Sequence, residues 1–347
     1  MFENTNQRTE LGALGEFGLI DHIAKSVRIQ NTETIKGIGD DGAIIEYKEG
    51  VTVASTDLLL ENVHFDLTFH PLLHLGYKAI VVNLSDIYAM NAIPKQVLVS
   101  LGVSNRFSLE ALEELYSGME MACEKYKVDL VGGDTTASTK GLILGITALG
   151  TAPKERIVYR SGAKANDLLC VSGDLGGAFL GLQILKREKQ IFLENPGVQP
   201  DLAGNDYILE RQLKPEARKE IVEKLLELNV IPTSMIDISD GLSSEVLHLC
   251  KSSGVGCSVY EDKIPIDPQT YERAGEFNLD PTVCALSGGE DYELLFTIRQ
   301  EDYEKLRMHM DISIIGHMTD PAEGVNLVSK SGHVVKLKAQ GWDAMQS

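Results

Sequence analysis

The sequence of 347 residues lacks an apolar run long enough to cross a bilayer, so no membrane-spanning helix is predicted. Its first residues, MFENTNQR, are polar and contain no apolar signal core, which predicts a protein that is not exported. Its few cysteines are scattered and form no Cys-x-x-Cys pair, so neither a disulfide framework nor a thiolate zinc site is expected. Together these absences predict a cytoplasmic protein.

Positive charge is also scarce. The chain has 32 Lys and Arg against 51 Asp and Glu, a formal net charge of −19. Such a surface repels nucleic acid and anionic membranes, so neither is expected as a partner. It would also repel a nucleotide, unless divalent cations stand between the two sets of negative charge.

The common nucleotide-binding motifs are missing. The sequence contains no Gly-x-x-x-x-Gly-Lys-Ser/Thr loop and no protein-kinase catalytic loop. The glycine-rich stretch GDLGG at 173–177 opens a predicted helix and could offer backbone N–H groups to a phosphate. Close packing of a strand against a helix explains this stretch equally well.

The pattern of predicted strands and helices favours an α/β or α+β protein of two sheet-containing domains, residues 1–152 and 153–347. In the first part we predict a strand over 51–55 that ends at 56–57, and a helix over 77–90. Ser108 is the predicted N-cap of a further helix. In the second part, a strand over 235–238 leads into a helix that extends to residue 251.

The most informative feature is the placement of aspartates at predicted element ends or between apolar and glycine residues. There a carboxylate is costly unless it is compensated, and a hard divalent cation such as Mg²⁺ is the natural compensation. Each placement also has a structural interpretation: Asp57 or Asp240 as a helix N-cap, Asp86 as a partner of Asn83, and Asp134 as a turn residue. Six such placements together favour a shared metal site. They are Asp41, Asp57, Asp86, Asp134, Asp237 and Asp240.

Seven motifs in order resemble those of the thiamine-monophosphate kinase family, part of the superfamily that includes aminoimidazole ribonucleotide synthetase. They are GIGDD at 37–41, STD at 55–57, NLSD at 83–86, GGDT at 132–135, RSGA at 160–163, DISDGL at 237–242 and SGGEDYEL at 287–294. The resemblance extends from GEF at 15–17 to GWD at 341–343. Only the stretch 188–218 matches poorly, and it has no predicted role.

The resemblance implies a fold, a reaction and an assembly. The fold is the two-domain aminoimidazole ribonucleotide synthetase-like fold, whose N-terminal sheet pairs across a two-fold axis in a homodimer. The N-terminal domain would bind metal and nucleotide, and the C-terminal α/β domain would close the active-site cleft. The implied reaction is the transfer of the γ-phosphate of ATP to thiamine monophosphate, which yields thiamine diphosphate, assisted by several Mg²⁺ ions.

The resemblance also assigns roles to single residues. The implied Mg²⁺ ligands are Asp41, Ser55, Thr56, Asp57, Asp86, Asp134, Asp237 and Asp240, and the implied ATP contacts are Gly133, Asp134, Arg160 and Ser239. His64, Glu290 and Trp342 would bind thiamine monophosphate. Among these residues Asp57, Asp86, Asp134 and Asp240 are the expected catalytic side chains. A structural histidine at 64 and a packed C-terminal anchor at 342 are the alternatives for two of the substrate contacts.

The implied chemistry agrees with the residues. The attacking phosphate oxygen is already anionic, so no general base is needed, and the difficulty is the repulsion between two phosphate groups. A large set of aspartates without a Ser or His nucleophile fits direct in-line transfer without a phosphoenzyme. The alternatives are another ATP-dependent enzyme of the superfamily, closest to aminoimidazole ribonucleotide synthetase, and a regulator that binds Mg²⁺ and nucleotide without turnover.

Overall fold

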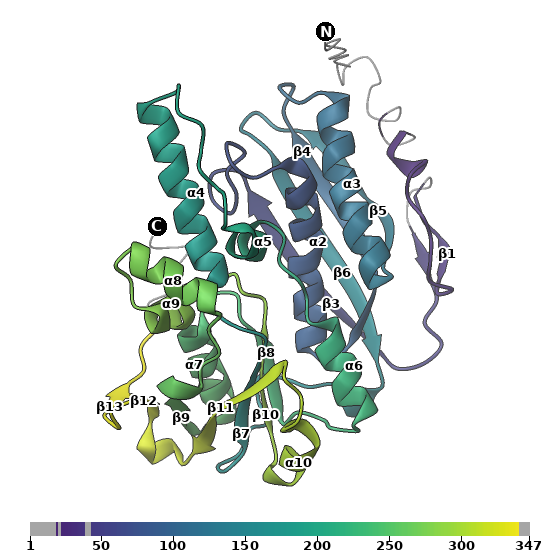
Figure 1. Cartoon of the computed structure of the whole chain (residues 1–347). Coiled ribbons are helices and arrows are strands. Elements are labelled where there is room, and N and C mark those ends of the chain that lie inside the picture. The colour runs from purple at the N-terminus through teal and green to yellow at the C-terminus, as the bar shows by residue number, and fades with distance from the viewer. Residues whose placement is uncertain (1–18, 20–21, 39–42, 340–347) are drawn as a thin grey trace. The chain divides into compact units, whose positions relative to one another are not determined.

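The computed structural model describes all residues except 1–18, 20–21, 39–42 and 340–347. The chain divides into two compact units, Met1–Ile87 with Ile93–Pro153, and Tyr88–Ala92 with Lys154–Ser347 (Figure 1). The main boundary between the units falls after Pro153, one residue from the predicted domain boundary. Within the described ranges, every helix is too short or too polar to serve as a membrane span.

The first unit is built on a four-stranded sheet in the order β3-β6-β4-β5. Strands β3 and β4 are each antiparallel to β6, whereas β4 and β5 are parallel. A separate pair, β1 with β2, is antiparallel. The elements are β1 (Thr34–Lys36), β2 (Ile44–Ile45), β3 (Val51–Leu60), α2 (Leu72–Ala89), β4 (Ile93–Val103), α3 (Leu109–Tyr126), β5 (Asp129–Ala137) and β6 (Ile143–Ala152).

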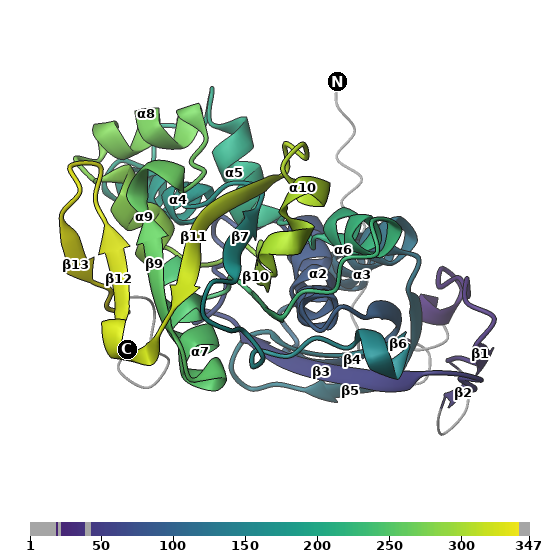
Figure 2. The ribbon, with the colours of Figure 1, turned by 90° about the horizontal axis from the view of Figure 1, so that it is seen from below.

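Helices α2 and α3 lie side by side on one face of this sheet (Figures 1 and 2). Their backbones cross closely at two glycines: a Cβ on Gly76 would lie 1.9 Å from the Leu115 carbonyl oxygen, and one on Gly118 would lie 1.9 Å from that of Leu73. No other residue fits at such a crossing. The N-cap predicted at Ser108 is confirmed, since its hydroxyl accepts the Ala111 N–H at 3.4 Å.

The second unit contains a seven-stranded sheet in the order β13-β12-β9-β11-β7-β10-β8, mostly antiparallel, with β12 parallel to β9. Its strands are β7 (Leu168–Ser172), β8 (Ser234–Asp237), β9 (Gly256–Tyr260), β10 (Leu294–Ile298), β11 (Ile312–Thr319), β12 (Val325–Val328) and β13 (Val334–Lys336). Its helices are α4 (Gly177–Glu194), α5 (Asp206–Leu213), α6 (Lys219–Glu227), α7 (Leu242–Ser253), α8 (Pro268–Glu276), α9 (Pro281–Ser287) and α10 (Tyr303–Leu306).

Two apolar clusters hold this unit together. In the larger one, Leu242, Val246 and Leu249 of α7 pack with sheet residues such as Val171 and Leu295. The smaller cluster joins four helices through Leu180 and Ile184 of α4, Ile208 of α5, Ala274 of α8 and Cys284 of α9. Both units therefore combine a sheet with covering helices, and the predicted α/β (α+β) class is confirmed.

The predicted end of the strand at 56–57 is wrong. The strand expected to end at 56–57 continues to Leu60, because Leu58, Leu59 and Leu60 pair with β6. Asp134, for which a turn was the structural alternative, lies within β5. Both aspartates therefore project from a sheet surface, and neither caps a helix.

Candidate functional site

Three of the predicted residues meet on the helix-covered face of the first unit's sheet. Ser55 and Asp57 alternate with Thr56 along β3, so their side chains share a face. Asp86 lies on α2, and the Ser55 hydroxyl donates to its Oδ2 at 2.5 Å. The structure thus brings together two carboxylates and one hydroxyl from residues 31 positions apart.

The side chain of Asn83 fixes the local backbone. Its Oδ1 accepts the N–H of Asp57 at 3.0 Å, while its Nδ2 donates to the carbonyl of Ala79 one turn earlier. Asn83 is fully buried, so these bonds satisfy an otherwise costly amide. The motif NLSD therefore supplies one residue that orients β3 and another, Asp86, that faces Asp57.

The two carboxylates repel each other. Loss of hydration around the Asp57 carboxylate, followed by the negative charge of Asp86, raises the pKa of Asp57 to about 6. A cation between two such groups would remove this penalty. The donor set is all oxygen, which fits Mg²⁺.

Among the residues that the structure describes, no group of three or more His, Cys, Asp and Glu side chains is arranged to hold a metal ion. Mg²⁺ in phosphate-transfer sites is typically bound by one or two carboxylates, with water and substrate phosphate oxygens as its other ligands. Asp57, Asp86 and Ser55 fit such a partial protein shell.

Thr56 and Asp134 face the other way. In the sheet register, Asp57 is in line with Ile146, Val99 and Gly133, whereas Asp134 is in the next row with Ser100. Because successive rows point to opposite faces, Asp57 and Asp134 leave the sheet on different sides. Within this unit the structure therefore does not bring these two predicted ligands together.

Gly133 also has a structural reason for being glycine. A Cβ at this position would lie 1.8 Å from the Val99 carbonyl oxygen, so the close approach of β5 to β4 excludes any side chain. Its predicted contact with ATP stays a prediction. His64 follows β3, and its Nδ1 accepts the N–H of Leu60 at 3.0 Å. The ring proton of the neutral imidazole is therefore on Nε2.

In the second unit, the motifs DISDGL and SGGEDYEL form two loops that bind each other through their backbones. The Glu290 N–H donates to the Ser239 carbonyl at 2.7 Å, and the Tyr292 N–H donates to that of Ile238 at 2.9 Å. Glu290 and Tyr292 have positive φ angles of 58° and 52°. Between the loops, a Cβ on Gly289 (φ 72°) would lie 2.6 Å from the Ser239 carbonyl oxygen.

This pairing places several predicted residues close together. Burial raises the pKa of Asp240, while the charges of His248 and Arg160 lower it and that of Glu290 raises it, so these groups lie within electrostatic reach of one another. Asp237 is nearly buried, at 5% exposure, at the end of β8. Arg160, Ser239, Asp240 and Glu290 therefore share one end of this unit.

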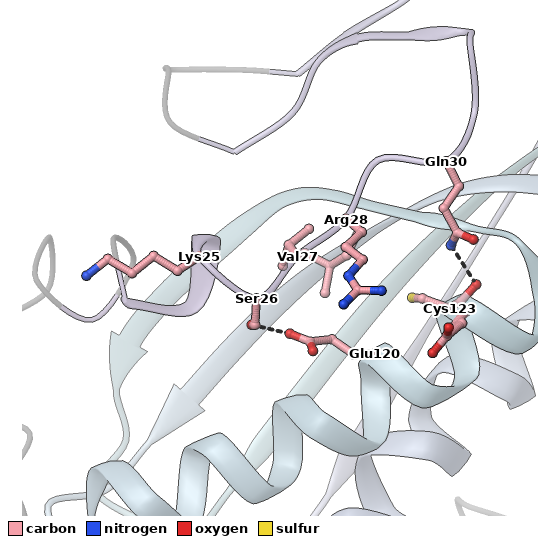
Figure 3. A pocket seen from close by; sticks show the side chains of 9 residues that line it. Lys25, Ser26, Val27, Arg28, Gln30, Glu120 and Cys123 are labelled. Carbon is pink, nitrogen blue, oxygen red and sulfur yellow. Dashed lines mark hydrogen bonds between the residues drawn. The ribbon is translucent and has the colours of Figure 1, made fainter.

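Two predicted residues, Asp41 and Trp342, lie outside the described residues. The remaining predicted site residues do not line the pocket shown in Figure 3. That cavity, of about 370 Å³, lies between residues 25–30 and α3, and its walls include Arg28, Glu120 and Cys123. Gln30 donates to the Cys123 carbonyl at 3.2 Å there, which ties the N-terminal segment to α3.

Comparison with known proteins places this chain among its relatives. The model of "AIR synthase related protein, N-terminal domain" matches residues 39–152. The thiamine-monophosphate kinase of Aquifex aeolicus is 35% identical over 96% of this chain and 98% of its own length, and that of Bacillus subtilis is 32% identical over 95% and 99%. The chain belongs to the thiamine-monophosphate kinase family. Among solved structures, "AaThiL complexed with AMPPCP and TMP" has a TM-score of 0.73 at 33% identity and covers 98% of this chain and 100% of that one.

These relatives confirm the predicted family, the predicted fold and the prediction of a kinase enzyme. They do not test the residue roles, which stay predictions. The structure also identifies residues that support the site of this thiamine-monophosphate kinase family member and that the sequence did not reveal. Glu245 on α7 is 2% exposed, and its Oε1 accepts the Asp240 N–H at 3.2 Å, which holds the DISDGL loop.

A buried ion network supports the SGGEDYEL loop of this family member. Arg211 reaches Glu293 at 3.0 Å and Asp291 at 3.6 Å, and Arg218 also donates to Glu293. Asp291 accepts the Gly176 N–H at 2.9 Å. The Gly176 N–H is thus already bonded to a carboxylate, and a Cβ on Gly176 would lie 2.9 Å from the Ala285 nitrogen, so close packing against α9 accounts for this glycine. Both arginines lie in the poorly matching stretch 188–218, for which the sequence predicted no role.

Asp291 should make the free energy of unfolding depend on pH. Burial raises its pKa from 3.8 to about 7, against the lowering effect of Arg211. Between about pH 4 and 7 the folded state then binds more protons than the unfolded state, so the free energy of unfolding contributed by Asp291 falls as pH rises. Urea unfolding at several pH values should show a flatter dependence for Asp291→Asn than for the unchanged protein. Equal slopes would contradict the assignment.

Proposed function

We propose that this protein transfers the γ-phosphoryl group of ATP to the phosphate of thiamine monophosphate, producing thiamine diphosphate and ADP. The observation that carries the proposal is the cluster of Ser55, Asp57 and Asp86, formed from two motifs shared with the kinase family. The relatives named as thiamine-monophosphate kinases, and the related structure bound to AMPPCP and TMP, support the choice of both substrates.

The acceptor and the donor are both anionic, and the protein itself carries a net charge of −19. Three sets of negative charge must therefore approach one another. Bound Mg²⁺ would neutralise phosphate charge and stabilise the charge that develops on the transferred group. In the first unit Asp57, Asp86 and Ser55 would hold one Mg²⁺ ion. Thr56 and Asp134, on the opposite face of the sheet, and Asp41 are proposed ligands of further Mg²⁺ ions. Asp237 and Asp240 are the proposed ligands from the second unit.

The protein's own groups then bind and orient the substrates. Arg160 would add a fixed positive charge for the phosphates of ATP, and Gly133, Asp134 and Ser239 are further proposed ATP contacts. Glu290 would attract the cationic thiazolium ring of thiamine monophosphate, with His64 and Trp342 as the other proposed contacts. The attacking oxygen needs no deprotonation, so direct in-line transfer requires no protein nucleophile.

The homodimer implied by the family also stays a proposal. The sheet face opposite α2 and α3 carries Leu58, which is 56% exposed, and the next residue pair on that face, Leu60 with Ile143, is partly exposed. An apolar side chain that is open on a sheet face suits a second copy of the chain better than water.

The test is incubation of the purified protein with Mg²⁺, ATP labelled at the γ-phosphate and thiamine monophosphate. We expect the label to appear in thiamine diphosphate, in equal amount to the ADP formed, with none attached to the protein. A labelled protein intermediate would contradict direct transfer. Binding of both ligands without product would favour the non-catalytic regulator, and turnover only with a ribonucleotide acceptor would favour an aminoimidazole ribonucleotide synthetase-like enzyme.

A further inference from the structure

The stretch 188–218 has no role that the sequence reveals, yet the structure connects its second half to the loop that carries Glu290. Helix α5 ends with Arg211, Gln212 and Leu213, all buried. Arg211 binds the two carboxylates that follow Glu290 in the motif, Asp291 and Glu293. The neighbouring residue, Gln212, binds Glu290 itself.

The contact between Gln212 and Glu290 joins side chain to side chain. Gln212 Nε2 donates to Glu290 Oε2 at 2.8 Å, across 78 positions of sequence. Gln212 is 4% exposed, whereas Glu290 is half-buried. A buried donor that bonds a more accessible carboxylate limits the directions in which that carboxylate can point.

The backbone of Glu290 is held as firmly. Its φ of 58° is unusual for a residue with a side chain, and the bond from its N–H to Ser239 maintains it. Below it, Arg218 and Ser172 both donate to the fully buried Glu293, and Gly176 donates to Asp291. The backbone of Glu290 is therefore firmly held, and the bond from Gln212 restrains its side chain.

We propose that Gln212 is a positioning residue: it orients the Glu290 carboxylate toward the cationic ring of thiamine monophosphate. This inference rests on the proposed function. It assigns a role in substrate recognition to α5, and it predicts that Gln212 affects the binding of thiamine monophosphate but not that of ATP.

The test is Gln212→Met, which keeps a side chain of similar length and volume but removes the N–H donor. A hydrogen bond to a charged group is worth enough to change binding by about tenfold, so we expect KM for thiamine monophosphate to rise about tenfold. KM for ATP should change by less than about twofold, because the Glu290 side chain is not among the proposed ATP contacts.

The matched control is Gln190→Met. Gln190 on α4 makes the same kind of bond, from Nε2 to the Oε1 of Glu194 at 2.7 Å, but on an exposed helix surface. Its kinetic constants should equal those of the unchanged protein. The thermal unfolding temperature of each variant shows whether the change affects folding.

A double-mutant cycle separates positioning from packing. Glu290→Gln alone should also raise KM for thiamine monophosphate, and adding Gln212→Met to it should have little further effect, because the partner is already lost. Additive effects, an unchanged KM in Gln212→Met, or an equal rise in both KM values would overturn the inference. An unchanged protein that makes no thiamine diphosphate would overturn the proposed function and this inference with it. An active unchanged protein with a normal Gln212→Met variant would overturn this inference alone.

Discussion

Asp57→Asn is expected to lower kcat by on the order of 10²- to 10³-fold while the protein stays folded. Asparagine has nearly the same shape, but it lacks the charge that a divalent cation requires from its ligand. The effect should fall on kcat because the lost interaction stabilises charge that develops during phosphoryl transfer. Steady-state kinetics at saturating Mg²⁺, ATP and thiamine monophosphate measure it.

The stability of metal-free Asp57→Asn should not fall with its kcat. Without metal, the Asp57 carboxylate faces that of Asp86, and this repulsion contributes to the pKa of about 6. Removing one of the two charges removes the repulsion, so the metal-free variant should unfold at the same temperature as the unchanged protein or at a higher one. Asp86→Asn should behave alike.

The control is Asp262→Asn, which neutralises an exposed aspartate paired only loosely with Lys263 at 3.7 Å. It should keep full activity, because a surface ion pair of this kind contributes little. Near-normal kcat in both Asp57→Asn and Asp86→Asn would rule out the proposed metal ligands. A loss of kcat together with a large fall in unfolding temperature would show a structural role instead.

Arg211→Met is expected to lower the free energy of unfolding by about 3–5 kcal/mol. Burial alone would lower the pKa of Arg211, but the charges of Glu293 and Asp291 outweigh it and raise that pKa. Both acids are fully buried, and Arg218 would still pair with Glu293, so removal of Arg211 takes the cation away from Asp291 in a poorly hydrated interior. The expected loss is a large part of the stability of an ordinary protein.

Chemical denaturation followed by circular dichroism measures the loss. Arg299→Met is the matched control, since Arg299 pairs with Glu301 at 3.2 Å and both side chains are about two-thirds exposed, 67% and 70%. It should change the free energy of unfolding by less than about 0.5 kcal/mol. A change below about 1 kcal/mol in Arg211→Met would show that the network is not a strong anchor for the SGGEDYEL loop.

The sequence predicted the presence of helices and strands better than the residues at which they begin and end. The strand from 235 and the N-cap at Ser108 were predictable because short-range patterns determine them. The end of β3 was not, because Asp57 disfavours a strand and only pairing with β6 carries the strand past it. The helix predicted from 77 begins at Leu72, directly after Pro71.

For the candidate site, motifs identified the residues but not their faces. Nothing in STD or GGDT shows that Asp57 and Asp134 leave the sheet on opposite sides, since that depends on the register of β3, β6, β4 and β5. The roles of Arg211 and Gln212 could not be predicted from the sequence for another reason. Polar residues in a short helix normally face solvent, whereas these two are buried against acidic partners. The partners lie far away in the sequence, so no local pattern predicts the burial.

The central claim is that Asp57 and Asp86 help hold divalent cations against the phosphates of the substrates. Crystals grown with Mn²⁺, a non-hydrolysable ATP analogue and thiamine monophosphate test it most directly, through anomalous diffraction at the manganese edge. We predict manganese within ligand distance of both carboxylates, about 2.0–2.2 Å from their oxygens. Substrates bound with no metal at either carboxylate would contradict the claim.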